Sequence, residues 1–462
     1  MEYIENKIYS EISIGDTSSL QHTLTAKDIE LFAIVSGDVN PAHVDVEFAN
    51  DDMFHGVIAH GMWGASLFST LLGTSLPGPG TIYLGQTLKF SSPVRVNDVV
   101  TVSVTAINKR DDKNIIEFEC KCTTQDGKVA ISGVSTVIAP TNKVKRERIV
   151  MPEVSLVKQN NVLLKKLLLL RENMEPLITA IVHPVDELSI SGAVAAAEDG
   201  IMIPILIGPK QKINEAAQKS NVDISKYQLI DTVHSHEAAT IAVELARTGK
   251  VEAIMKGKLH SDELMSAVVN RQSGIRTERR MSHVFAIELD GYERPLFLTD
   301  AAINLFPNLE EKADIIQNSI DLFNALDMGT PKVAIVSAVE TINPKITSTL
   351  DAAALCKMSD RGQITGGVLD GPLAFDNAIS VEAAQIKGIK SNVAGKADII
   401  VVPDIESGNL LYKQMTYMSK MEAAGVVLGA KVPIILTSRG SDVASRKYSS
   451  LLALVYARRK YN

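Results

Sequence analysis

Two side chains on one short segment combine a carboxylate with an imidazole. Asp38 and His43 lie in SGDVNPAHVD (residues 36–45), directly after a stretch, residues 27–35, with the pattern of a helix. Pro41 lacks a backbone donor and disfavours the helical conformation in the residue before it, so the helix must end there. Both groups then share one irregular loop and can reach the same small molecule. Such a pair can take a proton from water and return one to carbon, as the addition of water to a conjugated thioester requires.

The enolate that forms in this addition needs hydrogen-bond donors. His60 and Gly61 open the segment GMWGASLFSTLLG (residues 61–73), which is apolar almost all round and rich in small residues, as expected of a helix buried on every side. The first N–H groups of that helix would lie at the positive end of its dipole. Spacing alone leaves the alternative open, in which Asp38 is a turn residue and His43 an ordinary loop histidine.

The second half of the chain ends several apolar runs with polar turns. These turns are KGKLHS (residues 256–261), PDIESGN (residues 403–409) and TSRGSD (residues 437–442), and a fourth segment, RQSGIRTERRMSH, is rich in arginine. Sheets of this kind bind ligands at the carboxyl ends of their strands, and a turn before a helix can hold an anion. Taken singly, each segment is more often ordinary loop chemistry, and an arginine cluster is usually a solvated face; together they indicate an anionic substrate. The candidate binding residues are Lys256, His260, Arg276, Asp404 and Asn409, and Ser441 or Asp442 is suited to cap the last helix.

The elements that must position these groups change character along the chain. Alternation in residues 100–106 and 116–122, followed by a third strand at 128–139, predicts an antiparallel sheet, with Cys120 and Cys122 on its core face. One buried helix wrapped by such a sheet is the α+β hot-dog arrangement. From residue 160 onward, apolar strand-like runs alternate with amphipathic stretches, which predicts an α/β domain with helices on both faces of the sheet.

A charged stretch separates the two patterns. Residues 141–149 carry four basic residues and one acidic residue, and Pro140 and Pro152 bound the region. We therefore expect domains at 1–140 and 161–462 with a linker at 141–160. The alternative, a basic patch for anionic lipid or nucleic acid, has few charges to support it.

Composition excludes several functional classes. The 462 residues carry a net charge of −7, which argues against general nucleic-acid binding. Three cysteines match neither a disulfide framework nor a zinc pattern, no cluster of metal ligands is visible, and the Gly78–Gly85 region lacks a nucleotide fingerprint. The N-terminus is polar, and the longest apolar run, residues 162–170, is too short to span a membrane. We expect a soluble, cytoplasmic protein without a bound metal.

Residues 10–140 resemble the (R)-specific enoyl-CoA hydratases of the MaoC-like hot-dog family, through FAIVSGDVNPAHVD, AHGMWGASLFS and LPGPGTIYLGQTLKFSSPVRVNDVVTV. The resemblance implies that Asp38 and His43 are the catalytic pair that holds the attacking water. It also implies that Gly61 supplies the oxyanion amide and that Ser69 lines the acyl pocket. Ala42 departs slightly, because the family often has a larger aliphatic residue there. Hot-dog hydratases usually bury their sites at dimer interfaces, so a homodimer at least is implied.

Residues 160–462 resemble the phosphate acetyltransferase and phosphate butyryltransferase family, through GPLAFDNAIS, KADIIVVPDIESGNLLYK and TSRGSD. The resemblance implies an isocitrate-dehydrogenase-like fold of two α/β subdomains with the active site between them. It implies reversible acyl transfer between CoA and phosphate, with these molecules as substrates and no bound cofactor. Ser438 can donate to the reacting carbonyl and Arg439 can hold phosphate through its fork of N–H groups. The family's aspartate seven positions beyond the serine is Ser445 here, so either Asp442 substitutes as the base, or the base lies elsewhere, or activity is weak.

The order of the two halves is similar to that of bifunctional enoyl-CoA hydratase/phosphate acetyltransferases. The leading hypothesis is therefore a bifunctional acyl-CoA enzyme. A second hypothesis is an active hydratase whose C-terminal half only binds acyl-CoA or phosphate. A third, a metal- and nucleotide-dependent dehydrogenase, is disfavoured by the missing glycine fingerprint and carboxylate cluster.

Overall fold

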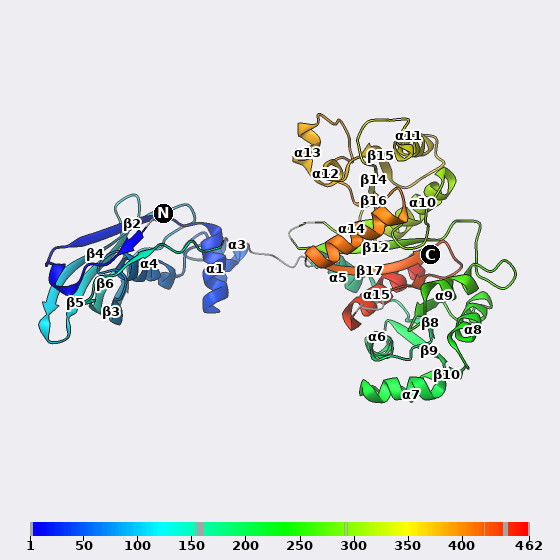
Figure 1. Cartoon of the computed structure of the whole chain (residues 1–462), viewed down its shortest axis with the longest axis horizontal. Coiled ribbons are helices and arrows are strands. Elements are labelled where there is room, and N and C mark those ends of the chain that lie inside the picture. Colours follow the sequence, from blue (N-terminus) through cyan, green and yellow to red (C-terminus); the bar gives the residue numbers. More distant parts are fainter. Residues whose placement is uncertain are drawn as a thin grey trace. The chain divides into compact units, whose positions relative to one another are not determined.

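The chain forms two units, which are described separately. The computed structural model describes residues 3–152, 154, 161–290, 292, 294–419, 421–437 and 442–460. One unit covers residues 1–156 and the other residues 157–462 (Figure 1). Each unit has its own buried hydrophobic clusters, one in the first and three in the second.

The first unit wraps an antiparallel sheet around one helix, in the strand order β2-β4-β5-β6-β3. Val100, Val102 and Val104 alternate along β4, and all three are fully buried in one cluster with Phe68 and Leu72 of α4. The period-two alternation of the sequence therefore places one face of the sheet on the helix. The elements are β1 (Tyr3–Glu5), β2 (Thr17–Thr23), α1 (Ala26–Ser36), α2 (Pro41–Val44), α3 (Val46–Asp51), α4 (Gly61–Thr74), β3 (Ile82–Phe90), β4 (Val99–Arg110), β5 (Ile115–Thr123), β6 (Val129–Ile138) and β7 (Lys145–Glu147).

The end of the first unit differs from the sequence prediction. Strand β7 lies within the stretch assigned to a linker, yet it pairs antiparallel with β1 at the start of the chain. Side-chain pattern could not indicate this pairing, because the three residues of β7 are all exposed and charged. Residues 155–160, also assigned to the linker, lie outside the described part of the chain.

The second unit is an α/β fold built on one eleven-stranded sheet, in the order β10-β9-β8-β11-β18-β17-β12-β13-β16-β14-β15. Its strands are β8 (Leu177–Val182), β9 (Met202–Gly208), β10 (Gln228–Asp231), β11 (Ala253–Lys256), β12 (Ser282–Leu289), β13 (Leu296–Thr299), β14 (Lys332–Val336), β15 (Val368–Leu373), β16 (Ile399–Val401), β17 (Met421–Leu428) and β18 (Ile434–Ile435). Its helices are α5 (Val162–Leu170), α6 (Glu187–Glu198), α7 (Lys210–Lys219), α8 (Ser235–Arg247), α9 (Ser261–Val268), α10 (Leu309–Ala325), α11 (Thr347–Asp360), α12 (Phe375–Ile379), α13 (Val381–Ile386), α14 (Ile405–Met418) and α15 (Val443–Lys460).

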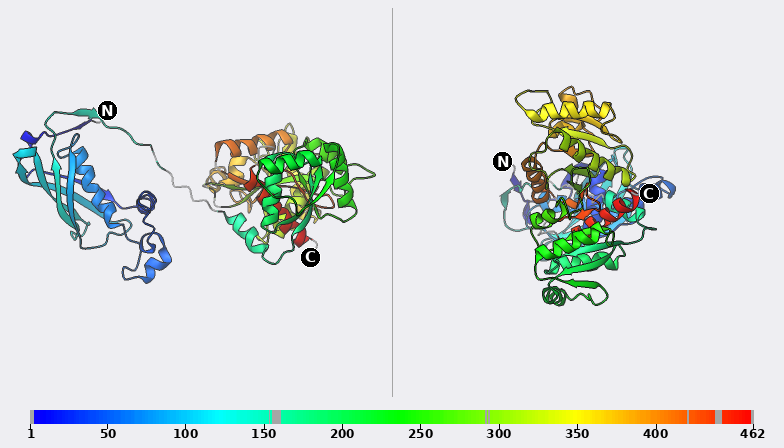
Figure 2. Two further views of the ribbon diagram at one scale, coloured as in Figure 1. Left: turned by 90° about the horizontal axis from the view of Figure 1, so that it is seen from below. Right: turned by 90° about the vertical axis from the view of Figure 1, so that its right-hand side faces the viewer.

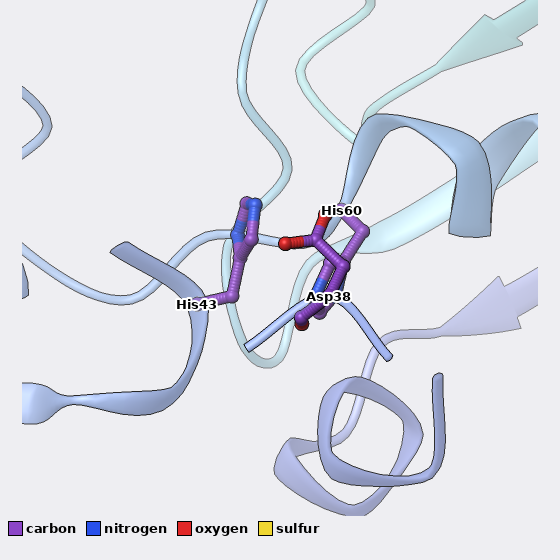
Figure 3. A group of neighbouring side chains, drawn as sticks. All are labelled: Asp38, His43 and His60. Atoms are coloured by element: carbon purple, nitrogen blue, oxygen red, sulfur yellow. Dashed lines mark hydrogen bonds between the residues drawn. The ribbon is translucent and has the colours of Figure 1, made fainter. Parts of the chain in front are cut away.

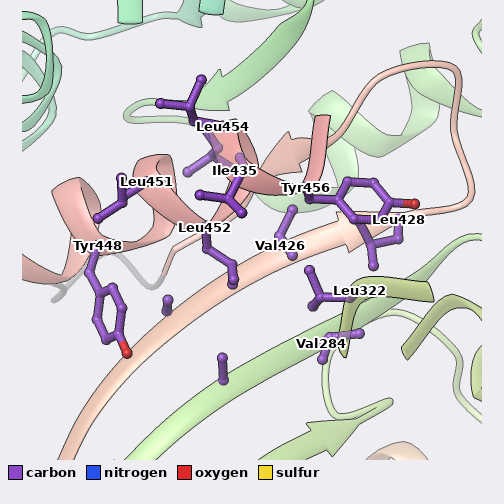
Figure 4. Close-up of a cluster of buried hydrophobic side chains, with 14 of the residues drawn as sticks. Val284, Leu322, Val426, Leu428, Ile435, Tyr448, Leu451, Leu452, Leu454 and Tyr456 are labelled. Atoms are coloured by element: carbon purple, nitrogen blue, oxygen red, sulfur yellow. The ribbon is translucent and has the colours of Figure 1, made fainter. Parts of the chain in front are cut away.

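Helices cover both faces of this sheet (Figure 2). Along β8, Leu177 and Ile181 belong to one buried cluster, while Ala180 and Val182 belong to another. Helix α15 contributes Leu451, Leu452 and Leu454 to the first of these clusters, which also contains Val426 of β17 (Figure 4). A sheet that is buried on both faces explains why its strands are apolar runs without alternation.

The sheet changes direction near its middle. Strands β10, β9, β8, β11 and β18 run parallel to one another, but β18 is antiparallel to β17 and β17 is antiparallel to β12. Strand β12 is in turn antiparallel to β13, from which β16, β14 and β15 continue in parallel. After these three reversals the two parallel halves point in opposite directions. Their carboxyl ends therefore lie at opposite edges of the sheet.

Candidate active sites

The loop between α1 and α4 positions the first candidate site. Helix α1 ends at Gly37, whose φ of 75° is in the left-handed region that glycine tolerates best. Pro41 occupies the first turn of α2, and the Asn40 side chain caps that helix. The predicted irregular loop thus contains one short helix, and this helix carries His43 back towards Asp38 (Figure 3).

Three side chains converge at this point. A carboxylate oxygen of Asp38, a nitrogen of His43 and a nitrogen of His60 lie within 4.8 Å of one another. The Nδ1 of His43 lies 2.8 Å from the carbonyl oxygen of Ile58. A carbonyl oxygen only accepts, so Nδ1 carries the proton and Nε2 of the neutral ring is left as a base. The structure therefore brings the predicted pair, Asp38 and His43, together.

The three side chains are also of the types that ligate metal ions. The rings of His43 and His60 contact each other in a tilted arrangement, with their centroids 3.9 Å apart and their planes 36° apart. One nitrogen of each ring is also within hydrogen-bond distance of a backbone carbonyl, that of Ile58 for His43 and that of Asp38 for His60.

The three side chains border a cavity of about 560 Å³. Apolar side chains form most of its wall, among them Phe32, Trp63 and Phe90. Gly61, the first residue of α4, also lines it, and a Cβ atom there would lie 2.8 Å from Phe90 Cε1. The first N–H groups of a helix have no acceptor inside the helix, so those of α4 are placed to donate to a ligand.

Ser69 lies elsewhere on the same helix. Its side chain is exposed, and it is not among the described residues that line this cavity. Eight residues beyond Gly61, it is more than two helical turns further along α4. Its predicted place in the acyl pocket stays a prediction.

The second candidate site falls at one edge of the large sheet. Lys256 is the last residue of β11 and is buried, and the exposed His260 precedes α9. Strand β18 pairs with β11 in parallel register, Ile435 opposite Met255, so the turn that follows β18 emerges at the same edge. The predicted site residues Ser438 and Arg439 lie outside the described residues.

Asp442 caps the last helix, as the sequence suggested. Its Oδ1 accepts the backbone N–H of Ser445 at 2.8 Å. It also lines a cavity of about 440 Å³ together with Glu288, Asp290 and Glu422. Burial, and then the charges of Glu288, Asp442 and Asp290, raise the pKa of Glu422. The surroundings of Asp442 on this side are therefore acidic.

The other candidate binding residues lie at the opposite edge. Asp404 follows β16 and caps α14 by accepting the N–H of Ser407 at 2.8 Å. The amide of Asn409 donates to the carbonyl of Ala301 at 3.3 Å. Arg276 is exposed, and its backbone forms an isolated antiparallel β-bridge with Ala430. Ala430 precedes β18 in the chain, so Arg276 does not lie at the carboxyl end of that strand. The sheet therefore does not gather the polar turns into one place, because its two parallel halves are antiparallel to each other.

Arg446 is a neighbour of the second site that sequence reasoning did not identify. It lies on α15, is 2% exposed, and its Nη1 donates to the carbonyl of Lys256 at 3.4 Å. Its Nε is buried without a partner among the described residues, and burial lowers the pKa of the guanidinium. Its proximity to the end of β11 is set by the packing of α15, which no local pattern around Arg446 could indicate.

No helix in the described part of the chain has the length and apolar character needed to cross a membrane.

Two family models match the chain. Residues 13–127 match the MaoC like domain, and residues 232–453 match the phosphate acetyl/butaryl transferase model. The two matches fall in different units of the structure.

Relatives and a solved structure resemble the second unit. A phosphate acetyltransferase from Rhizobium meliloti is 55% identical over 285 residues, which is 62% of this chain and 90% of the relative. A phosphate butyryltransferase from Clostridium acetobutylicum is 44% identical over 275 residues, covering 60% of this chain and 91% of the relative. The structure of a branched-chain phosphotransacylase from Enterococcus faecalis V583 is 26% identical with a TM-score of 0.54, covering 61% of this chain and 99% of that one.

Proposed function

The chain belongs to the phosphate acetyl/butyryltransferase family and carries a MaoC-like hydratase domain, and is thus a bifunctional enzyme; we propose that both sites act on acyl-CoA thioesters. The first unit adds water to a trans-2-enoyl-CoA and forms a (3R)-hydroxyacyl-CoA. The second unit transfers an acyl group reversibly between CoA and inorganic phosphate.

The convergence of Asp38 and His43 on one cavity carries the hydratase proposal. The Nε2 of His43 is the free base of its ring, since Nδ1 is held by Ile58. One member of the pair takes a proton from water as its oxygen bonds to the β-carbon, and the partner returns a proton to the α-carbon. Negative charge builds on the thioester oxygen during this step, and in this proposal the N–H of Gly61 at the start of α4 donates to it.

A charge-removing substitution tests this assignment. Asp38→Asn should lower enoyl-CoA hydration, followed as loss of enoyl-thioester absorbance, by at least ~10²-fold. Asp51→Asn, the same change at an exposed carboxylate of α3, should leave the rate unchanged. Trp63 fluorescence during urea unfolding reports that the first unit of the variant is folded. Hydration at the normal rate in Asp38→Asn would exclude the carboxylate from the reaction.

Acyl transfer at the second site is supported by family membership along 90% of a relative's length. A phosphate oxygen attacks the thioester carbonyl, the carbon–sulfur bond breaks, and CoA leaves as a thiol after gaining a proton. In this proposal Ser438 donates to the carbonyl oxygen, Arg439 holds phosphate, and Asp442 transfers the proton to and from the CoA sulfur. No cofactor enters this scheme. The isocitrate-dehydrogenase-like arrangement of the unit is part of the proposal, supported by its two oppositely directed half-sheets.

Arg439→Ala separates an enzyme from a binding domain. We expect phosphate-dependent CoA release to fall by at least ~10²-fold while enoyl-CoA hydration is retained. A wild-type protein that binds acyl-CoA but releases no CoA with phosphate would support the binding-only alternative.

A homodimer and a cytoplasmic location complete the proposal. Strand β3 is an edge strand with exposed Ile82, Leu84 and Phe90, and such an edge is suited to pairing with a second copy of the chain. Leu84→Lys should reduce the molar mass measured by light scattering. The cysteines of the chain are free thiols, as is typical of reducing compartments.

A further inference from the structure

His60 is a side chain of the first site whose role neither the family match nor the sequence assigns. It occupies the position just before α4, is 3% exposed, and lines the cavity with Asp38 and His43. The usual reason for a polar residue at this position is to cap the helix. His60 makes no side-chain cap, so capping does not explain it.

The hydrogen bond of His60 is made to the loop that carries Asp38. Its Nε2 lies 2.9 Å from the backbone carbonyl oxygen of Asp38, twenty-two positions earlier in the chain. A carbonyl oxygen only accepts, so Nε2 carries the proton and Nδ1 of the neutral ring has an unprotonated lone pair. This Nδ1 is buried without a partner in the described structure. The bond uses the backbone of Asp38, whose side chain lines the cavity while its Oδ1 accepts the backbone N–H of Asn40 at 3.2 Å.

The ring of His60 also supports the second member of the pair. It contacts His43 in a tilted arrangement at 3.9 Å between centroids and Phe32 at 5.1 Å. The Nδ1 of His43 is held by Ile58, so this bond and the ring contact together restrict the His43 ring. One buried side chain thus contacts the loop of Asp38 and the imidazole of His43 at once.

We propose that His60 is the positioning residue of the hydratase site, which fixes the Asp38 loop through its Nε2–H while its ring contacts that of His43. The kinetic test of this inference rests on the proposed hydration, whereas a second test, of the order of the loop, needs no activity. His60 takes no proton in the reaction. Its hydrogen bond holds the loop that carries Asp38 in place, and misplacement by about 1 Å can cost ~10²-fold in rate.

Two amides distinguish the proposed bond from simple bulk. The amide nitrogen of glutamine can reach the position of Nε2, whereas that of asparagine reaches only the position of Nδ1. His60→Gln should therefore keep kcat for enoyl-CoA hydration within about three-fold of wild type. His60→Asn and His60→Leu should lose ~10²-fold in kcat with KM changed less than about three-fold. Equal losses in all three variants, or losses confined to KM, would overturn the proposal.

Hydrogen exchange gives the second measurement, on the full-length chain. Backbone amides of residues 36–45 should exchange faster in His60→Asn and His60→Leu than in wild type and in His60→Gln. Exchange that is the same in all four proteins would contradict the positioning role. If the wild-type protein hydrates no enoyl-CoA, the proposed function fails while this comparison still decides whether His60 orders the loop.

Discussion

Burial keeps His283 of β12 uncharged over a wide range of pH. The side chain is fully buried, its Nε2 lies 3.2 Å from the carbonyl oxygen of Leu436, and burial lowers its pKa from 6.5 to about 4. Below pH 6.5 the unfolded chain binds a proton at this position that the folded chain does not. The uncharged His283 therefore contributes to the free energy of unfolding fully above pH 6.5. This contribution, up to roughly 3 kcal/mol, is lost as pH falls towards 4.

His283→Gln tests this sign. Glutamine can donate to the same carbonyl but does not titrate, so the variant should lose less stability than wild type between pH 6.5 and pH 4.5. Asp300 is also buried and its pKa is raised, which favours folding at low pH, but it is present in both proteins and cancels in the difference. Urea unfolding of the second unit, followed by circular dichroism at several pH values, measures the difference. Parallel pH profiles for the two proteins would contradict the assignment.

Asp442 combines a structural role with a proposed chemical one. Its carboxylate caps α15, and asparagine is an equally good cap whereas alanine is not. We expect Asp442→Ala to destabilise the second unit by about 1 kcal/mol and Asp442→Asn by less than about 0.5 kcal/mol. If the carboxylate handles the thiol proton, both variants lose ~10²-fold in phosphate-dependent CoA release. A normal rate of CoA release by Asp442→Asn would exclude the carboxylate from the reaction and leave capping of α15 as its role.

The sequence predicted single site residues correctly where a local constraint on the backbone fixed their position. Pro41 required a break after α1, and that break is what allows Asp38 and His43 to meet. The side chain of His60 was missed because its partners lie far away in sequence, although a histidine in a capping position was a usable signal. Arg446 gave no such signal, since only packing brings it to Lys256.

At the scale of elements, the periodicity of the sequence predicted which residues share a buried face, but not where the strands of the large sheet change direction. The alternating strands β4, β5 and β6 are as predicted. Helix α4 is present, but the prediction that it is buried on every side is wrong, because Met62, Ser66 and Ser69 on its other face are exposed. In the second unit the predicted apolar runs left out β10, β13, β15 and β17, and of these β13 and β17 are the antiparallel partners of β12. The sequence of an apolar strand buried on both faces does not indicate whether it runs parallel or antiparallel to its neighbours. It could therefore not be predicted that the polar turns after the strands lie at two opposite edges of the sheet.

Close approach of two strands makes one glycine of the first unit essential. A Cβ atom on Gly133 of β6 would lie 1.8 Å from the backbone oxygen of Thr87 on β3, whereas one on Gly73 of α4 meets nothing within 4 Å. Gly133→Ala should therefore cost ~2 kcal/mol or more, because backbone must move. Gly73→Ala should stabilise the unit by roughly 0.5–1 kcal/mol through helix propensity.

The single tryptophan, Trp63, lies in this unit, so its fluorescence during urea unfolding reports these two changes without interference from the second unit. A Gly133→Ala protein as stable as Gly73→Ala would contradict the close approach of β3 and β6.

At the scale of the whole molecule, the two units have separate cores, so we expect them to unfold separately. The cluster around α4 contains only residues of the first unit, and the other three clusters contain only residues of the second. Calorimetry of the full-length chain should show two transitions, of which Trp63 fluorescence follows one. A single cooperative transition would contradict this independence.

Ligands should shift these two transitions in a pattern that reports the shared thioester. A ligand present at a hundred times its Kd stabilises the unit that binds it by about 2.7 kcal/mol. Inorganic phosphate binds only the acyltransferase site in our proposal, and should raise only the second unit's transition. A saturated acyl-CoA has no double bond to hydrate and, without phosphate, no acceptor for its acyl group, so it remains intact and should raise both transitions. A saturated acyl-CoA that raises one transition alone would show that the two sites do not recognise the same class of molecule, and that their fusion has a different basis.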